Sequence, residues 1–356
     1  MNIVRPRLTE HLIKKNAFSK NPLLVVDIGA RGGPESHWLH YKNQIQVLAF
    51  EPDERECEAL NRRSSPISVS YYPRALHKDE GTKEFYEMSA QGSSFYRANQ
   101  EFVKRFPDKV NLTVKGKRSI GTTTLDSFLE KNNFSYADFI KVDTEGSELD
   151  ILQGSKDALK KSVLGISCEV LFVPWRENKV VFSNVERFLY ELGFKVYDLS
   201  SFRYARKSLP GQKSVLKSVS GSADWGQIIV GQALFFRDPI EEIQNRDTNS
   251  DEWDEKRIYK MVTLFEIFGL PDCAIELMQF AEKENIIKDD EKTLDLYRDL
   301  TVKSAKGVTY AQYQKKLEKI KKRGYINLFD MLKARIRKND LAKKIYSFIR
   351  KKKKHV

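Results

Sequence analysis

Residues 25–33 have the sequence Val-Val-Asp-Ile-Gly-Ala-Arg-Gly-Gly and join an apolar run to a glycine-rich turn. The continuous apolar run at 23–26 predicts a buried strand of a parallel sheet. A strand that ends in acid-x-Gly-x-x-Gly brings glycine backbone to the carboxyl edge of such a sheet, where a nucleotide-like ligand can approach. The stretch therefore predicts a ligand-binding turn of an α/β protein.

The same alternation of apolar runs and helical stretches continues to about residue 236 and predicts an α/β fold with a Rossmann-like parallel sheet and helices on both faces. Further strands are predicted at 47–50, 67–72, 139–142, 163–170, 196–199 and 233–236, and helices at 54–63, 147–158 and 183–192. Between residues 81 and 125 the pattern changes to hairpin-like segments at 82–88 and 110–115, which predicts an insertion near one edge of the sheet.

Two acids distinguish among the ligands that such a turn could bind. Glu51 ends the next predicted strand, 22 residues beyond Gly29, where a carboxylate can accept both ribose hydroxyls. The dehydrogenase fingerprint needs Gly-x-Gly-x-x-Gly, and Arg31 breaks it. Asp27 suits a ligand with a positively charged amino group and gives no help to a pyrophosphate. The residues favour S-adenosylmethionine over NAD.

Two further carboxylates, Asp143 and Glu145, follow a buried strand at its carboxyl end, where open α/β sheets place their chemistry. Methyl transfer to a hydroxyl requires loss of a proton, which a general base or a metal ion can promote. We expect Asp143 and Glu145 to act either as the base or as oxygen ligands of a divalent ion, with Glu169 on the adjacent strand joining them. For Glu145, stabilisation of the following helix N-terminus is the competing interpretation. His37 and His77 are alternative bases.

Three strings occur in order and together resemble the FkbM family of S-adenosylmethionine-dependent methyltransferases. They are the turn at 27–33, the Thr-Thr-Thr-Leu-Asp stretch at 122–126, and the string Lys-Val-Asp-Thr-Glu-Gly-Ser-Glu at 141–148, closed by Leu-Gln-Gly at 152–154. The resemblance covers roughly residues 22–237. One departure is Arg31, where the family has Asn, and this side chain either contacts the substrate or the donor carboxylate or points to solvent.

The resemblance implies a set of residues around the donor. It places Glu51 on the ribose, and it gives Ser93 and Ser94 a contact with donor or acceptor, for which plain turn chemistry is the equal alternative. The remaining implied donor residues are Asp27, Gly29, Ala30, Arg31, Gly33, Asp53, Ala75 and Leu76. It also implies an oxygen acceptor on a glycan, a lipid-linked sugar or a secondary metabolite. The non-enzymatic alternative is a binding or scaffold protein that keeps this fold and acts through its helical C-terminal region.

The sequence divides into four parts: a helical lead-in (1–21), the methyltransferase-like domain (22–238), an acidic linker (239–256) and a helical extension with a basic tail (257–356). Residues 257–286 predict a helical hairpin around Gly-Leu-Pro at 269–271, which resembles one tetratricopeptide-like helix pair.

Charge is distributed unevenly along these parts. The net charge of +13 divides into +6 for residues 1–236, −9 for 237–300 and +16 for 301–356. The first interpretation of the basic tail is a solvated helix end. The second is attachment of 341–356 to an anionic membrane surface, which the apolar residues at helical spacing before the final basic run would suit. Nucleic acid is the weakest partner, because aromatic residues are not interleaved with the basic ones and no base-methylation motif occurs.

Three scattered cysteines, the lack of an 18-residue apolar run and a charged start without an apolar segment predict a reduced, cytoplasmic location, at the inner membrane face if the tail binds lipid. The sequence gives no indication of the oligomeric state.

Overall fold

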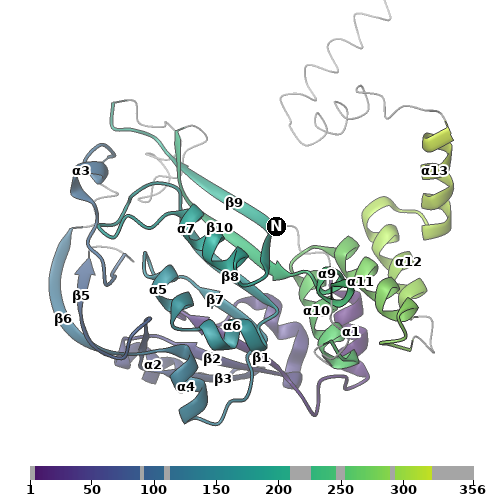
Figure 1. The fold of residues 1–356 in the computed structure, drawn as a ribbon, viewed down its shortest axis with the longest axis horizontal. Coiled ribbons are helices and arrows are strands. Elements are labelled where there is room, and N and C mark those ends of the chain that lie inside the picture. The colour runs from purple at the N-terminus through teal and green to yellow at the C-terminus, as the bar shows by residue number, and fades with distance from the viewer. Residues whose placement is uncertain are drawn as a thin grey trace, which may run out of the picture. The chain divides into compact units, whose positions relative to one another are not determined.

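The computed structural model describes residues 5–88, 92–107, 113–208, 226–245, 253–288 and 293–322. The described residues up to Lys288 belong to one compact unit, and those from Thr293 onward belong to a second. Figure 1 shows both units coloured along the chain. The tail at 341–356, with its predicted membrane contact, lies outside the described residues.

Within the described residues, seven strands form one sheet in the order β3-β2-β1-β7-β8-β10-β9. All neighbouring strands pair in parallel except β10, which is antiparallel to both β8 and β9. The order turns outward in both directions from the β1/β7 pair, so the carboxyl ends of β1 and β7 meet at a switch point where open α/β sheets bind ligands. The predicted Rossmann-like class is confirmed. The strands are β1 (Leu23–Ile28), β2 (Ile45–Phe50), β3 (Ser68–Tyr72), β7 (Phe139–Val142), β8 (Gly165–Leu171), β9 (Phe194–Tyr204) and β10 (Gln227–Arg237).

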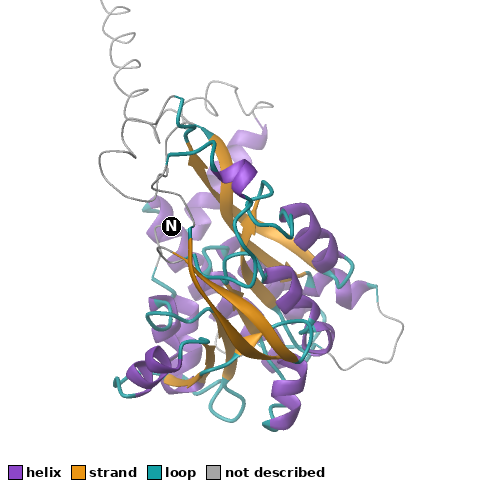
Figure 2. Cartoon of the chain, turned by 90° about the vertical axis from the view of Figure 1, so that its left-hand side faces the viewer, coloured by secondary structure: helices purple, strands orange, loops and turns teal. Residues whose placement is uncertain are grey.

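Helices cover both faces of this sheet (Figures 1 and 2). Residues of β7 alternate between the two layers, as strand geometry requires. Ile140 belongs to the buried cluster under the helices of one face, while Phe139 packs on Trp38 and Phe268 on the other. The helices of this unit before residue 238 are α1 (Arg7–Lys14), η1 (Ser36–Gln44, 3₁₀ turns), α2 (Glu54–Asn61), α3 (Gln100–Val103), α4 (Leu125–Lys131), α5 (Glu148–Gln153), α6 (Lys156–Lys161) and α7 (Phe182–Tyr190).

The predicted insertion forms a small second sheet beside the main one. Its order is β4-β6-β5, with β4 (Ala75–Leu76), β5 (Gly81–Met88) and β6 (Val114–Thr123). The expected segment at 82–88 is confirmed. The second expected segment, at 110–115, lies partly outside the described residues. In its described part β6 starts at Val114 and pairs with β5 as far as Thr122, so the strand runs well beyond the predicted end.

The predicted helix at 147–158 is two helices, α5 and α6, which are separated at Gly154. A Cβ atom there would lie 2.3 Å from the carbonyl oxygen of His77, so the chain approaches too closely for any other residue. Ser155 begins the next turn.

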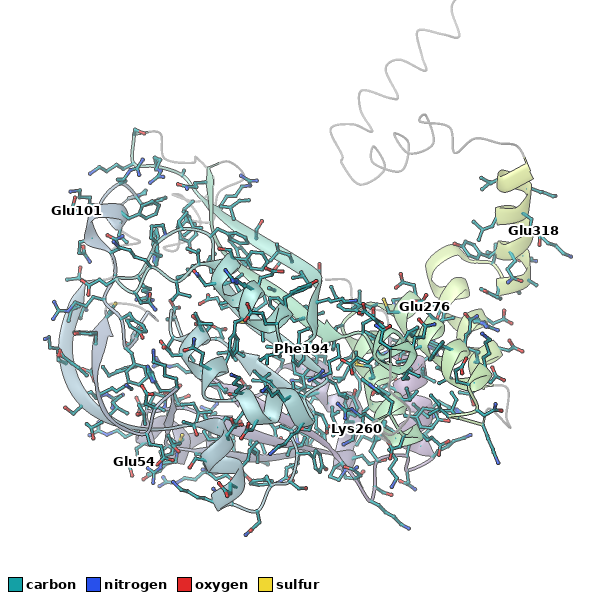
Figure 3. All side chains as sticks on the ribbon, in the orientation of Figure 1. Glu54, Glu101, Phe194, Lys260, Glu276 and Glu318 are labelled. Carbon is teal, nitrogen blue, oxygen red and sulfur yellow. The ribbon has the colours of Figure 1, made fainter. Side chains whose placement is uncertain are left out.

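The hairpin predicted at 257–286 is confirmed as α10 (Glu255–Ile267) and α11 (Pro271–Lys283), and it belongs to the same compact unit as the sheet. A short helix, α9 (Pro239–Gln244), lies within the stretch expected as a linker. Lys260 of α10 (Figure 3) is buried and pairs with Asp138 at 2.7 Å, next to β7.

The second unit contains α12 (Thr293–Lys306) and α13 (Tyr310–Lys322). In the part of the chain that the structure describes, no helix combines the length and apolar character that crossing a bilayer would require.

Candidate active site

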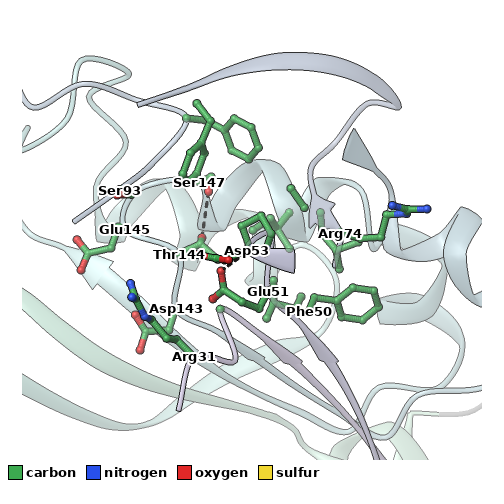
Figure 4. A pocket seen from close by; sticks show the side chains of 18 of the residues that line it. Arg31, Phe50, Glu51, Asp53, Arg74, Ser93, Asp143, Thr144, Glu145 and Ser147 are labelled. Carbon is green, nitrogen blue, oxygen red and sulfur yellow. Dashed lines mark hydrogen bonds between the residues drawn. The ribbon is translucent and has the colours of Figure 1, made fainter. Parts of the chain in front are cut away.

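A cavity of about 380 Å³ opens at the carboxyl edge of the main sheet. Loops after β1, β2 and β7 supply one part of its lining. The β3–β4 turn and the β4–β6 insertion supply an opposite wall, which also carries the charged residues Arg74, Glu87 and Arg118. In the view of Figure 4, Glu145 and Ser93 lie at one end of the pocket and Arg74 lies at the other. Predicted site residues that line the cavity are Gly29, Arg31, Glu51, Asp53, Ala75, Leu76, Ser93, Asp143 and Glu145.

The loops after β1 and β7 touch at Gly29. This residue has φ +81°, and a Cβ atom on it would lie 2.0 Å from the carbonyl oxygen of Asp143. Only glycine fits there, so the glycine of the turn is required by both backbone conformation and space. Ala30 is buried, and neither Ala30 nor Gly33 is among the lining residues.

Glu51 ends β2 with its side chain at the cavity. Its Oε1 accepts a hydrogen bond from the Asp53 backbone N–H at 3.0 Å, and burial raises its pKa. Asp53 has a second role, because its Oδ1 accepts from the backbone N–H groups of Arg55 and Glu56 and so caps α2. Glu51 therefore presents a carboxylate held in place by the start of α2.

Asp27 lies behind the cavity, where its carboxylate is 3% exposed and burial raises its pKa. Its Oδ1 lies 3.2 Å from Nζ of Lys141, which donates to the Gly29 carbonyl oxygen and lies 3.8 Å from Asp143 Oδ2. The Asp27 charge is thus met by a lysine of the chain itself. The sequence prediction of direct contact with an ammonium group of a ligand did not anticipate Lys141.

Glu145 has the most distinctive environment among the catalytic candidates. Its backbone adopts φ +63°, which is uncommon for a residue other than glycine. Arg176 donates from Nη2 to Glu145 Oε2 at 2.7 Å. Burial raises the pKa of Glu145 to about 7, although Arg176 opposes the shift. A carboxyl group of this pKa can take up or release a proton near neutral pH.

The competing interpretation of Glu145 was stabilisation of the N-terminus of the following helix. At the start of α5 the structure shows a different carboxylate, Glu148, bound to backbone N–H groups. Glu148 accepts from the backbone N–H groups of Thr144 and Gly146, both at 3.0 Å. Ser147 donates to Thr144 Oγ1, which donates in turn to Glu148. Glu148 therefore fixes the loop that presents Asp143 and Glu145.

Glu169 of β8 lies near Glu145, but it is not among the residues that line the cavity. Burial and the neighbouring carboxylate Glu145 raise its pKa well above the usual range. Among the described residues, no group of three or more His, Cys, Asp or Glu side chains is arranged to hold a metal ion.

The insertion contributes an apolar wall formed by Phe85, Met88 and Phe95. Ser93 lines the cavity and accepts from the Met88 backbone N–H at 3.1 Å. Ser94 is fully buried, and its backbone pairs with Tyr86. Both serines therefore have turn roles, and only Ser93 lines the pocket.

Residues 27–196 match the family model described as the methyltransferase FkbM domain. This part of the chain belongs to the FkbM methyltransferase family. The matched FkbM domain contains the loops after β1, β2 and β7 and the whole insertion.

One curated relative is the 2-O-methyltransferase NoeI of Sinorhizobium fredii, 21% identical over 145 residues. The match covers 39% of this chain and spans 60% of the length of that relative. Among solved structures, methyltransferase FkbM of Methylobacillus flagellatus is 14% identical with a TM-score of 0.32, over 60% of this chain and 43% of that one. The N-methyltransferase NodS of Bradyrhizobium japonicum, solved with S-adenosyl-L-homocysteine, is 11% identical with a TM-score of 0.27, over 65% and 86% of the two chains.

Two residues of the FkbM domain site were missed by sequence reasoning. Lys141 lies inside the 141–148 string, and a lysine within an apolar strand of four residues could have drawn notice as a buried charge. Arg176 lies 31 positions beyond Glu145 in an irregular loop. The one signal for it in the sequence was a charged residue just after the carboxyl end of β8.

Proposed function

We propose that this chain is an S-adenosylmethionine-dependent O-methyltransferase whose acceptor is a hydroxyl of a small molecule or glycan. The observation that carries the proposal is the presence of a ribose-type acid, Glu51, and a carboxyl group poised near neutrality, Glu145, on one cavity. The name of the distant relative, a 2-O-methyltransferase, supports an oxygen acceptor.

In this proposal the donor lies along the loops after β1 and β2. The Glu51 carboxylate accepts the ribose hydroxyls. Ala75 and Leu76 border the adenine beside Asp53, and the Gly29 turn lets the ligand approach the backbone. Lys141 pairs with Asp27 and opposes the rise that burial causes in the pKa of its carboxyl group, so these two residues support the turn from behind.

The sulfonium methyl group is transferred by in-line displacement, so alignment of donor and acceptor provides most of the rate enhancement. The acceptor oxygen forms a bond to the methyl carbon as the carbon–sulfur bond breaks, and the hydroxyl proton passes to a carboxylate. Glu145 is the proposed base, because its pKa is about 7. Asp143 lies beside it on the cavity and orients the hydroxyl, and the charges of Asp143 and Glu148 add to the effect of burial in raising the pKa of Glu145. Glu169 lies close to Glu145 but outside the cavity lining.

The experiment is transfer of a labelled methyl group from S-adenosylmethionine to panels of glycans, lipid-linked sugars and hydroxylated small molecules. We expect label on an oxygen for wild type and less than about one hundredth of that rate for Glu145→Gln, as loss of general base catalysis implies. Glu177→Gln is the matched control. Label on nitrogen, or full activity of Glu145→Gln, would contradict the proposal.

A further inference from the structure

The FkbM domain contains a buried guanidinium that its motifs do not include. Arg176 is 1% exposed and lies in the loop after β8. Its Nη2 donates to Glu145 Oε2 at 2.7 Å. A buried charge is costly unless it is paired and hydrogen bonded, and the Glu145 carboxylate supplies the opposite charge for this guanidinium.

The loop that carries Glu145 lies against the Arg176 side chain. Glu145 and Gly146 both have positive φ, and a Cβ atom on Gly146 would lie 2.7 Å from Arg176 Cγ. Asn178 donates to the Gly146 carbonyl oxygen at 2.8 Å from the same loop as Arg176. The strained conformation at Glu145 is therefore maintained by contacts with Arg176 and Asn178.

The other end of the guanidinium reaches the insertion. Arg176 Nη1 donates to the Gly92 carbonyl oxygen at 3.1 Å and lies 3.4 Å from Met88 Sδ. Gly92 starts a segment at 92–99, here called the wall segment, which contains Ser93 and Phe95 of the cavity lining.

The wall segment runs alongside the Arg176 loop for its whole second half. Ala98 forms a β-bridge with Arg176, and the Asn99 N–H donates to the Trp175 carbonyl oxygen at 2.8 Å. The Glu177 N–H donates to the Arg97 carbonyl oxygen at 3.0 Å. One side chain thus touches both the base and the far wall of the cavity.

We propose that Arg176 is a positioning residue that fixes the Glu145 carboxylate and the wall segment in one arrangement, so that the base faces an acceptor held by that wall. The catalytic meaning of this inference rests on the proposed function. The forked guanidinium suits the task because it can donate in two directions at once, which a lysine ammonium at the end of a flexible stem does less well.

The first test measures the Glu145 titration directly, by carbon NMR of carboxyl-labelled glutamate with assignment from Glu145→Gln. We expect the midpoint in Arg176→Met to rise by about one unit or more, because an adjacent opposite charge commonly lowers a carboxyl pKa by 1–3 units. Arg187→Met is the control, since Arg187 pairs with Glu191 on the exposed surface of α7. An unchanged midpoint in folded Arg176→Met would overturn the proposal.

The second test asks whether the contact reaches the wall segment. We expect Glu145→Gln to increase backbone hydrogen exchange at residues 92–99 at least about threefold, since the charge-assisted contact is lost, while Glu177→Gln leaves it unchanged. Equal exchange in all three proteins would also overturn the proposal. If Arg176→Met fails to fold, Arg176→Lys takes its place. In that variant we expect the wild-type titration midpoint of Glu145 and increased backbone hydrogen exchange at 92–99.

Neither readout requires turnover, so the inference and the proposed function can fail separately. A wild-type protein that transfers no methyl group would remove the proposed function, while the titration and exchange data would still decide whether Arg176 couples the two elements. With an acceptor in hand, Arg176→Lys is expected to lower kcat more than it raises KM for the donor, because the donor-binding loops do not contact Arg176.

Discussion

The backbone at Gly29 approaches the carbonyl oxygen of Asp143 so closely that a Cβ atom would lie 2.0 Å from it. The loop after β1, which carries the proposed donor turn, and the loop after β7, which carries the proposed catalytic carboxylates, are therefore in direct contact at the switch point of the sheet.

Gly29→Ala should consequently destabilise the domain strongly, because it combines a steric clash with a positive φ. Gly32→Ala is the matched control, since Gly32 has φ +86° but a Cβ atom on it would meet no other atom within 4 Å. We expect the control to cost about 1–2 kcal/mol of unfolding free energy, from backbone strain alone, and Gly29→Ala to cost more. Urea unfolding measures both, and equal losses would contradict the close approach.

Glu51→Gln should weaken binding of the donor without unfolding the protein. A hydrogen bond to a charged group contributes about 1.5–3 kcal/mol, so we expect affinity for S-adenosylhomocysteine to fall about tenfold or more. Glu54→Gln, on the exposed start of α2, serves as the control and should bind normally. Undiminished affinity of Glu51→Gln would exclude the assigned ribose contact.

Two variants can distinguish the role of Asp53 as the N-cap of α2 from its proposed role in donor binding. Asp53→Ala and Thr124→Ala each remove an N-cap, of α2 and α4 respectively, and each should cost about 1 kcal/mol of stability. Only Asp53 also lines the cavity. A loss of donor affinity confined to Asp53→Ala is expected, and similar affinities in the two variants would reduce Asp53 to a cap.

The raised pKa of Glu145 predicts how stability depends on pH. Its folded-state pKa of about 7 exceeds the ordinary value of 4.5, so the folded state holds more protons between these values and loses stability as pH rises through about 7. Wild type should lose about 1–2 kcal/mol relative to Glu145→Gln between pH 5 and pH 8, a discounted figure because the side chain is 36% exposed. Parallel pH profiles of the two proteins would show that Glu145 is not perturbed.

The helical hairpin should be inseparable from the sheet in unfolding. Lys260 of α10 pairs with Asp138 beside β7, and Asp138 also accepts from the Leu24 N–H of β1. Lys260→Met leaves a buried carboxylate without its cation and should cost about 3–5 kcal/mol. The exposed Lys256→Met is the control. A small effect of Lys260→Met, or two separate unfolding transitions within residues 1–288, would contradict this link.

The sequence predicted the parallel strands and their terminal acids because buried parallel strands are short, continuous apolar runs, as at 23–26 and 139–142. It did not divide the helix at 147–158, which is interrupted at Gly154, where the chain lies against the distant His77 backbone. Contacts of this kind carry no periodic signal.

Site residues, like the secondary structure, were predicted where the signal is local in the sequence and missed where it depends on tertiary contacts. Glu51, Asp143 and Glu145 were predicted because each follows a strand end, and the structure brings all three to one cavity. Arg176 was missed because its partners, Glu145 and Gly92, are brought to it only by tertiary folding. Asp27 is not among the lining residues and its carboxylate pairs with Lys141, a pairing across adjacent strands that the linear motif did not display.

The most direct test of the account is a calorimetric titration of S-adenosylmethionine into the wild-type chain and into Glu51→Gln, with Glu54→Gln as control. The account predicts one site per chain in wild type and in the control, and binding weakened at least about tenfold in Glu51→Gln. No detectable binding by folded wild-type protein would contradict a methyltransferase that uses this cavity, and would favour a scaffold that retains only the fold.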